Sequence, residues 1–219
     1  MATDKAIRQR GRPKVGVQVA TALPFVLELP RSAKLTVSPE MFWKICCENR
    51  DLRLELTAKG KLIVMAPAGG ESGGQNADLV TDLNIWCRTD GTGKIFDSST
   101  GFTLPNGAVL APDASWIKLD RYLALSLEQR KRFPPICPDF VAELRSPSDG
   151  IRALRRKMRE YVAQGVRLGW LLDPITGQAE VYRPGRDAEV LDRPATLSGE
   201  EVLPGFVLNL RGILFDDAV

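Results

Sequence analysis

Residues 138–149 read PDFVAELRSPSD, and the apolar residues around Glu143 predict a buried strand over 139–145. A strand advances about 3.3 Å per residue, so Asp139 and Glu143 would lie about 13 Å apart on one face. That separation is too large for one metal ion, whose oxygen ligands lie about 2.0–2.6 Å away. A partner for Glu143 must come from elsewhere. Asp113, in the second Pro-Asp of APDASWI at 111–117, is the most economical candidate.

Side-chain alternation places Glu143 and Arg145 on the same face of this strand, about 6.6 Å apart. A buried Glu requires a compensating cation or hydrogen bonds, so a structural salt bridge with Arg145 or with a helix lysine is one interpretation.

A helix is predicted over 151–164, because apolar residues recur there at helical spacing. Lys157 borders this apolar stripe, so it either bends toward the sheet or lays its stem along the surface. Four arginines spread mainly over the outer side, where they form either a solvated face or a nucleic-acid contact: Arg152, Arg155, Arg156 and Arg159.

Histidine is absent from the sequence. This absence excludes Ser-His and Cys-His nucleophilic catalysis, His-ligated zinc and a histidine general base. A hydrolase built from this chain would have to use carboxylates, lysine or arginine, and a hard cation that prefers oxygen ligands.

The bulk composition predicts an ordinary globular protein, with 219 residues, 44% hydrophobic and 26% charged. We expect a basic, largely disordered tail over 1–34 and a single domain over 35–219. No apolar run long enough to span a membrane and no secretory signal is recognisable. The four cysteines form no CxxC pair and are interpreted as reduced core thiols of a cytoplasmic protein.

Strands and helices alternate without clean βα repetition, which predicts an α/β (α+β) fold with a mixed central sheet flanked by helices. A helix is expected after Ser38, which is a credible N-cap before Pro39. Further strands are expected at 52–56, 61–67, within 94–117, and at 168–173 and 179–184, and LPGFVLNL at 203–210 is the last recognisable element. Further helices are expected at 75–88, after a flexible AGGESGG, and within 118–133.

Asp113 in a Pro-Asp, followed by Glu143 with a basic residue two places on, resembles the PD-(D/E)XK nuclease core. Longer segments between about 38 and 210 resemble the Uma family of bacterial restriction endonucleases. The segments are PDASWI, CPDFVAELRSPSD, KMREYVAQGVRLGWLLDP, AEVYRP and LPGFVLNL. The resemblance implies a restriction-endonuclease-like fold and a metal-dependent DNA endonuclease. The alternative is an inactive nuclease scaffold that acts in nucleic-acid binding or protein interaction.

The resemblance also implies site residues. Asp113, Glu143 and the backbone carbonyl of Leu144 would hold Mg²⁺ or Mn²⁺. Arg145 stands where the pattern has a catalytic lysine, and arginine is a poor proton acceptor that can still stabilise negative charge. The resemblance places a lysine at Lys157, which would then be a migrated catalytic residue.

Two more acidic residues are candidates for a further metal ligand or a supporting contact, namely Glu55 and Glu71. The more ordinary interpretation of Glu55 is a solvent-facing strand residue, and that of Glu71 is a loop charge near a helix start.

The net charge is +3, and residues 1–14 carry +4, which leaves −1 for the rest of the chain. Arg10 and Arg12, in RGRP, resemble the core of an AT-hook, whose arginines lie in a narrow A·T-rich minor groove. A generic basic tail is the alternative. DNA is the expected partner, and a homodimer is compatible with the resemblance.

Overall fold

The computed structural model describes residues 36–215. The predicted tail over 1–34, including Arg10 and Arg12, lies outside these residues. The described part begins with α1 (Pro39–Glu48), where the Ser38 hydroxyl accepts the Met41 N–H at 3.2 Å, as the N-cap prediction requires. No described helix is both long and apolar enough to cross a bilayer.

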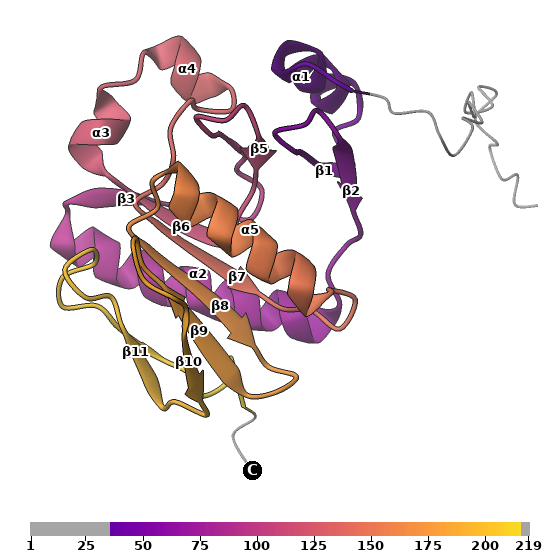
Figure 1. Ribbon diagram of the computed structural model, residues 1–219. Coiled ribbons are helices and arrows are strands. Elements are labelled where there is room, and N and C mark those ends of the chain that lie inside the picture. Colours follow the sequence, from indigo (N-terminus) through magenta and orange to yellow (C-terminus); the bar gives the residue numbers. More distant parts are fainter. Residues whose placement is uncertain (1–35, 216–219) are drawn as a thin grey trace, which may run out of the picture. The chain divides into compact units, whose positions relative to one another are not determined.

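A six-stranded mixed sheet forms the centre of the fold (Figure 1). Its strand order is β10-β9-β8-β7-β6-β3, and only β7 and β8 run parallel. The strands are β3 (Gly93–Asp97), β6 (Ala114–Lys118), β7 (Phe140–Leu144), β8 (Leu168–Asp173), β9 (Gln178–Tyr182) and β10 (Glu189–Asp192). The predicted mixed sheet is confirmed.

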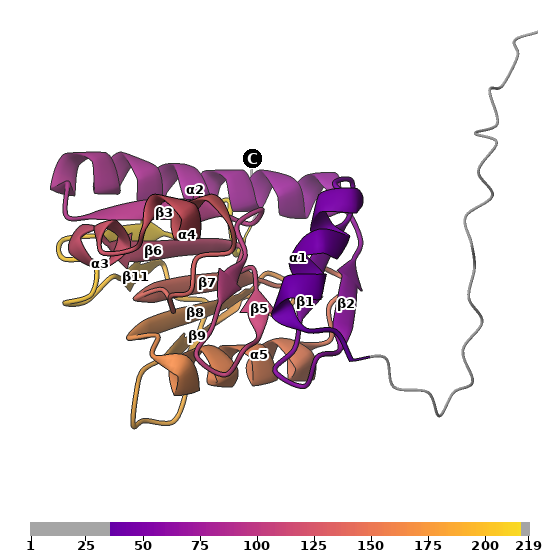
Figure 2. The ribbon, with the colours of Figure 1, turned by 90° about the horizontal axis from the view of Figure 1, so that it is seen from above.

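One long helix covers each face of this sheet, and Figure 2 shows the sheet between them. On one face α2 (Gly70–Asp90) buries Leu79 and Leu83 against strand residues such as Trp170. On the other face α5 (Ile151–Gln164) buries Met158 and Tyr161 in a second cluster. The apolar stripe predicted for 151–164 is therefore the buried face of α5, and both bounds of that helix are confirmed.

A second sheet, of order β2-β1-β5-β4, contributes a strand to the site described below. Its strands are β1 (Arg53–Leu56), β2 (Leu62–Met65), β4 (Phe102–Thr103) and β5 (Val109–Leu110). Hairpin turns join β1 to β2 and β4 to β5. Gly60 and Gly107 occupy them with φ of 73° and 84°, a left-handed conformation that glycine adopts without a steric penalty.

Several local predictions were wrong. AGGESGG is not a loop throughout, because α2 begins at Gly70; packing of its later turns outweighs the low helix propensity of glycine. The helix expected within 118–133 is two short helices, α3 (Leu119–Leu123) and α4 (Leu127–Lys131). The capping box of Ser126 and Gln129 is the reason for the break, since it starts a new helix.

The C-terminal part adds strands that were not predicted. A two-stranded sheet pairs β11 (Thr196–Ser198) with β12 (Val207–Asn209), and only the second lies in a segment recognised as an element from the sequence. All four cysteines are free, but Cys47 is exposed, so the prediction of core thiols fails there. Cys87 and Cys137 are buried as expected.

Candidate active site

The candidate site starts from one row of side chains across the central sheet. Ala114 of β6 pairs with Ala142 of β7, so the register sets Asp113 opposite Glu143. On the other side of β7, Glu143 pairs with Leu171 of β8. Asp113 and Glu143 therefore lie on the α5 side of the sheet, although 30 residues separate them in the sequence.

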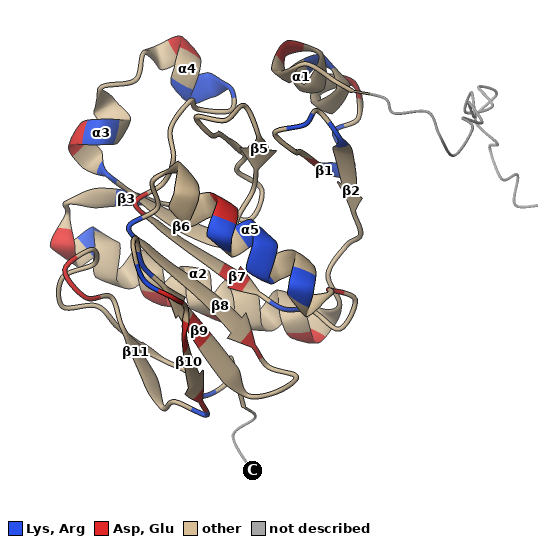
Figure 3. Cartoon of the chain, in the orientation of Figure 1, with Lys and Arg blue, Asp and Glu red and all other residues tan. Residues whose placement is uncertain are grey.

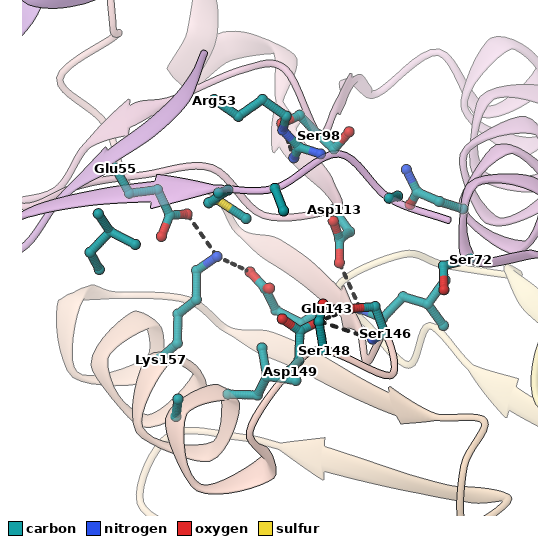
Figure 4. Close-up of a pocket in the computed structure, with 18 of the residues that line it drawn as sticks. Arg53, Glu55, Ser72, Ser98, Asp113, Glu143, Ser146, Ser148, Asp149 and Lys157 are labelled. Atoms are coloured by element: carbon teal, nitrogen blue, oxygen red, sulfur yellow. Dashed lines mark hydrogen bonds and ion pairs between the residues drawn. The ribbon is translucent and has the colours of Figure 1, made fainter. Parts of the chain in front are cut away.

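Lys157 reaches this row from α5 and joins it to the second sheet (Figure 4). Its Nζ lies 2.9 Å from Glu143 Oε1 and 2.8 Å from Glu55 Oε1. Nζ also donates to the Ala111 carbonyl at 3.2 Å. A lysine ammonium has three N–H donors, so these three acceptors occupy every N–H of Lys157.

The remaining contacts hold the two glutamates in place. The Ala111 N–H donates to Glu55 Oε1 at 2.9 Å, and the Tyr161 hydroxyl donates to Glu143 Oε1 at 3.3 Å. Both glutamates are nearly inaccessible, with 4% exposure for Glu55 and 3% for Glu143. The Glu143–Lys157 pair is one of the interpretations that the sequence allowed, a bridge to a helix lysine.

Burial dominates the protonation equilibria of the cluster. It raises the pKa of Glu143 to about 8, although Lys157 opposes the rise, and the charges of Asp113 and Glu55 add to it. Burial also raises the pKa of Asp113. Burial alone would lower the pKa of Lys157, but attraction to Glu143 and Glu55 raises it, so the ammonium stays charged.

Asp113 is held by the strand beside it. Its Oδ2 accepts the Leu144 N–H at 2.8 Å. Within residues 36–215, neither the other oxygen of Asp113, Oδ1, nor Glu143 Oε2 has a hydrogen-bond partner. Each carboxylate thus keeps one oxygen available for a ligand.

A cleft of about 1010 Å³ opens onto these carboxylates, between α5, the β1–β2 hairpin and the first turns of α2. One wall is apolar and comes mainly from β2 and the segment after it. The polar lining contains Arg53, Glu55, Ser72, Asn76, Ser98, Asp113, Glu143, Ser146, Ser148, Asp149, Arg156, Lys157 and Glu160. The cleft is large enough for a few nucleotides or another extended ligand.

The structure brings together Asp113, Glu143 and Lys157, and it adds Glu55. The solvent-facing interpretation of Glu55 was wrong, because β1 turns this side chain toward α5 and buries it. Glu71 is exposed at the start of α2 and is not part of the cleft lining.

Arg145 does not share a contact with Glu143. Because β7 ends at Leu144, the Arg145 guanidinium leaves that face and lies 2.8 Å from Asp173 Oδ2, with a further bond to the Asp149 carbonyl. The expectation that Arg145 stands beside Glu143 is therefore wrong. Asp139 is also separate, as predicted, and pairs with Arg121 at 2.7 Å.

The four arginines of α5 divide into two groups. Arg155 is paired with buried Glu180 at 2.6 Å and is only partly exposed. Arg152, Arg156 and Arg159 are exposed, and Arg156 lines the cleft.

Sequence reasoning missed Arg53. The available signal was its position two residues before Glu55, which places both side chains on one face of β1.

Charge is distributed unevenly along the described chain, and Figure 3 shows blue arginine and lysine positions on α5 and red acidic positions on the neighbouring strands. The basic face of α5 thus borders the acidic row. A chain with no histidine here combines carboxylates, a lysine and arginines around one cleft.

Comparisons with known proteins identify the family and the fold. The model of the Uma2 family, described as "Putative restriction endonuclease", matches residues 39–211. No curated protein matches the chain. A solved structure entitled "Crystal structure of a putative nuclease belonging to DUF820 from Anabaena variabilis ATCC 29413" is 20% identical, with a TM-score of 0.69. The alignment covers 81% of this chain and 97% of that one, and at this identity it supports the fold alone.

The family match spans most of the chain, from the first described helix to the last short strands. It contains the acidic row, Lys157 and the whole lining of the cleft. The chain belongs to the Uma2 family, whose description is "Putative restriction endonuclease".

Proposed function

We propose that this protein is a DNA endonuclease that hydrolyses phosphodiester bonds with the help of Mg²⁺ or Mn²⁺. The observation that carries the proposal is the pairing of Asp113 and Glu143 at the cleft, each with one oxygen lacking a protein partner. Family membership supports the same reaction class. The proposal places the scissile phosphate over these two carboxylates.

The donor set fits a hard divalent cation. Asp113 and Glu143 offer oxygen only, which suits Mg²⁺ and Mn²⁺. Residues 36–215 contain no group of three or more His, Cys, Asp or Glu side chains placed to hold a metal. This is compatible with Mg²⁺, which commonly binds one or two carboxylates and keeps several waters.

Asp113, Glu143 and the carbonyl of Leu144 would hold the ion. When bound, it would supply an acidified water and neutralise developing negative charge. The protein's own residues set up this site. Lys157 and Tyr161 fix Glu143 Oε1, which leaves Oε2 to face a ligand.

Lys157 has a positioning role in this proposal. Its three contacts anchor Glu55, Glu143 and the Ala111 carbonyl, and its charge offsets part of the acidic cluster. Without that cation, the buried carboxylates would repel each other and take up protons. Three exposed arginines of α5 would contact the DNA backbone, and within residues 36–215 none of them pairs with a carboxylate: Arg152, Arg156 and Arg159.

The test is cleavage of plasmid DNA by purified full-length protein with Mg²⁺, Mn²⁺, Ca²⁺ or EDTA. We expect nicks or breaks with Mg²⁺ or Mn²⁺ and none with EDTA. Asp113→Asn protein, purified in parallel, controls for contaminating nucleases. The proposal fails if the wild type cuts no DNA with either ion, or if Asp113→Asn cuts equally well.

One observation favours the alternative of a binding protein without activity. Lys157 has no free N–H donor, so it cannot contact an attacking water without breaking an existing bond. Tight DNA binding without cleavage, in the same set of ions, would establish this alternative.

A further inference from the structure

Phosphodiester hydrolysis builds negative charge on the phosphoryl oxygens, and nucleases meet that charge with fixed cations. Neither cation that the sequence suggested is free to do so. Lys157 donates to three protein acceptors, and Arg145 is bound to Asp173 and to the Asp149 carbonyl. A phosphate in the cleft would need another positive group.

Arg53 has the properties that the other two lack. It is half-buried, lines the cleft and donates from Nη2 to the Ser98 carbonyl at 2.7 Å. Within the described part of the chain, it forms no ion pair with a carboxylate. A guanidinium has five N–H donors, so most of them remain for a ligand.

The anchoring of Arg53 matters as much as its charge. A backbone carbonyl orients the guanidinium without neutralising it, whereas Glu180 neutralises Arg155. Figure 4 shows Arg53 and Ser98 on the Asp113 side of the close-up, with Lys157 and Glu143 on the other side. The positive charge of Arg53 also opposes the rise that burial causes in the pKa of Asp113, as expected for neighbours across the cleft.

We propose that Arg53 binds a non-bridging oxygen of the phosphodiester held over Asp113 and Glu143. This inference rests on the proposed function, because it names the substrate contact of the same site. The planar fork of arginine matches two phosphate oxygens, which lysine cannot do. Arg156, exposed at the rim of the same cleft, contacts a neighbouring phosphate instead.

The binding experiment uses full-length protein and a fluorescent DNA duplex in Ca²⁺, titrated over a range of salt. We compare Arg53→Ala, Arg53→Lys and a matched control, Arg50→Ala. Arg50 lies three residues upstream, is exposed, and likewise bonds only a backbone carbonyl, that of Cys47. Arg53→Ala should weaken binding about 10-fold and flatten the log–log salt slope by about 0.9. Arg53→Lys should keep the slope, and Arg50→Ala should match the wild type.

The cleavage experiment measures single-turnover rates of the same variants with Mg²⁺. Arg53→Ala should lose about 10²–10³-fold in rate. Added guanidinium ion should restore part of the lost rate in Arg53→Ala. It should not change the rate of Arg50→Ala.

Thermal unfolding separates a binding role from a structural one. If Arg53→Ala is unfolded, Arg53→Gln, which keeps a donor for Ser98, replaces it in both experiments. Wild-type affinity and salt slope in folded Arg53→Ala, or in folded Arg53→Gln where it replaces that variant, would overturn the inference. A wild type that binds DNA without cutting would refute the nuclease, while the binding titration would still decide the role of Arg53. A wild type that binds no DNA would refute both.

Discussion

Glu143 and Glu180 occupy the same row of the central sheet, on either side of Leu171, and both lie beneath α5. Glu180 has its own cation, because Arg155 donates to its Oε1 at 2.7 and 2.6 Å, and the Tyr182 hydroxyl donates to its Oε2. Glu143 shares Lys157 with Glu55 and lies opposite Asp113. The two glutamates are equally buried, with 3% of Glu143 and 4% of Glu180 exposed. They differ in the balance of charge around them.

This difference separates a structural ion pair from a candidate functional one. The Glu180 cluster matches one carboxylate with one guanidinium, which is how folded proteins retain buried charge. The Glu143 cluster sets three carboxylates against one lysine, and it opens onto a cleft. Such imbalance is costly unless another cation binds, and this cost supports the proposal that the Glu143 cluster binds a metal ion.

The largest expected effect is the loss of cleavage on replacing the acidic row. Asp113→Asn and Glu143→Gln should each lower the Mg²⁺-dependent rate about 10³-fold or more, because metal-assisted charge stabilisation is worth several kcal/mol. Glu180→Gln should keep the rate, although it lowers the free energy of unfolding by about 1–3 kcal/mol. Cleavage assays with circular dichroism of the variants decide this. If Glu143→Gln cleaves DNA like the wild type, Glu143 is not part of the catalytic site.

Replacing Lys157 should affect cleavage far more than replacing Arg155, the cation that pairs with Glu180. Lys157→Ala leaves two buried carboxylates without their cation, so it should cost about 3–5 kcal/mol of stability and about 10²–10⁴-fold in rate. Arg155→Ala should cost less stability, since Arg155 is 40% exposed, and it should leave cleavage unchanged. Urea unfolding and single-turnover rates provide the measurements.

A second substitution sharpens the test of Lys157. Glu55→Gln in the Lys157→Ala background should recover stability, because it removes one of the two stranded charges, but it should not recover the rate. If Lys157→Ala folds and cuts like the wild type, Lys157 has no part in the site.

The pH dependence of stability should distinguish Glu143 from the rest of the chain. Its pKa is about 8 in the folded protein rather than near 4.5, so the folded state holds this proton more tightly. The bound proton of Glu143 therefore makes its full contribution to the free energy of unfolding below about pH 4.5. This contribution is lost as the pH rises through about 8. Metal-free protein should lose up to about 1.4 kcal/mol per pH unit in this window. Glu143→Gln should abolish that slope in urea unfolding at pH 5–8, and an unchanged slope would contradict the assignment.

The smallest expected effect concerns Arg145. Arg145→Lys should keep the pair with Asp173 and lose at most the bond to the Asp149 carbonyl, which is worth about 1 kcal/mol. Cleavage should not change, since Arg145 is outside the cleft lining. A clear change in rate for this variant would show that Arg145 reaches the substrate.

The sequence predicted the parts of the site that depend on local periodicity. Alternation in 139–145 and the helical stripe of 151–164 made a pair of Glu143 with a helix lysine one of the possible interpretations. The resemblance supplied Asp113, whose place opposite Glu143 depends on strand pairing over 30 residues. Fold class followed from the same elements, and the comparisons confirm it.

The sequence could not predict contacts that depend on how separate sheets meet. Glu55 and Arg53 lie on β1, a strand of the second sheet, and a four-residue strand does not reveal which face is buried. Arg145 was misplaced because alternation was extended one residue beyond the end of β7. Glu180 and Arg155 were not recognised as partners, because their contact joins α5 to a strand far along the chain.

The most direct test of the central claim is titration of Mn²⁺ into metal-free wild type, Glu143→Gln and Glu180→Gln, followed by calorimetry. The wild type and Glu180→Gln should each bind an ion with similar affinity, and Glu143→Gln should bind it at least about 10-fold more weakly. Equal Mn²⁺ affinity in Glu143→Gln and the wild type would show that the two glutamates of the row do not differ in function, and it would contradict the account.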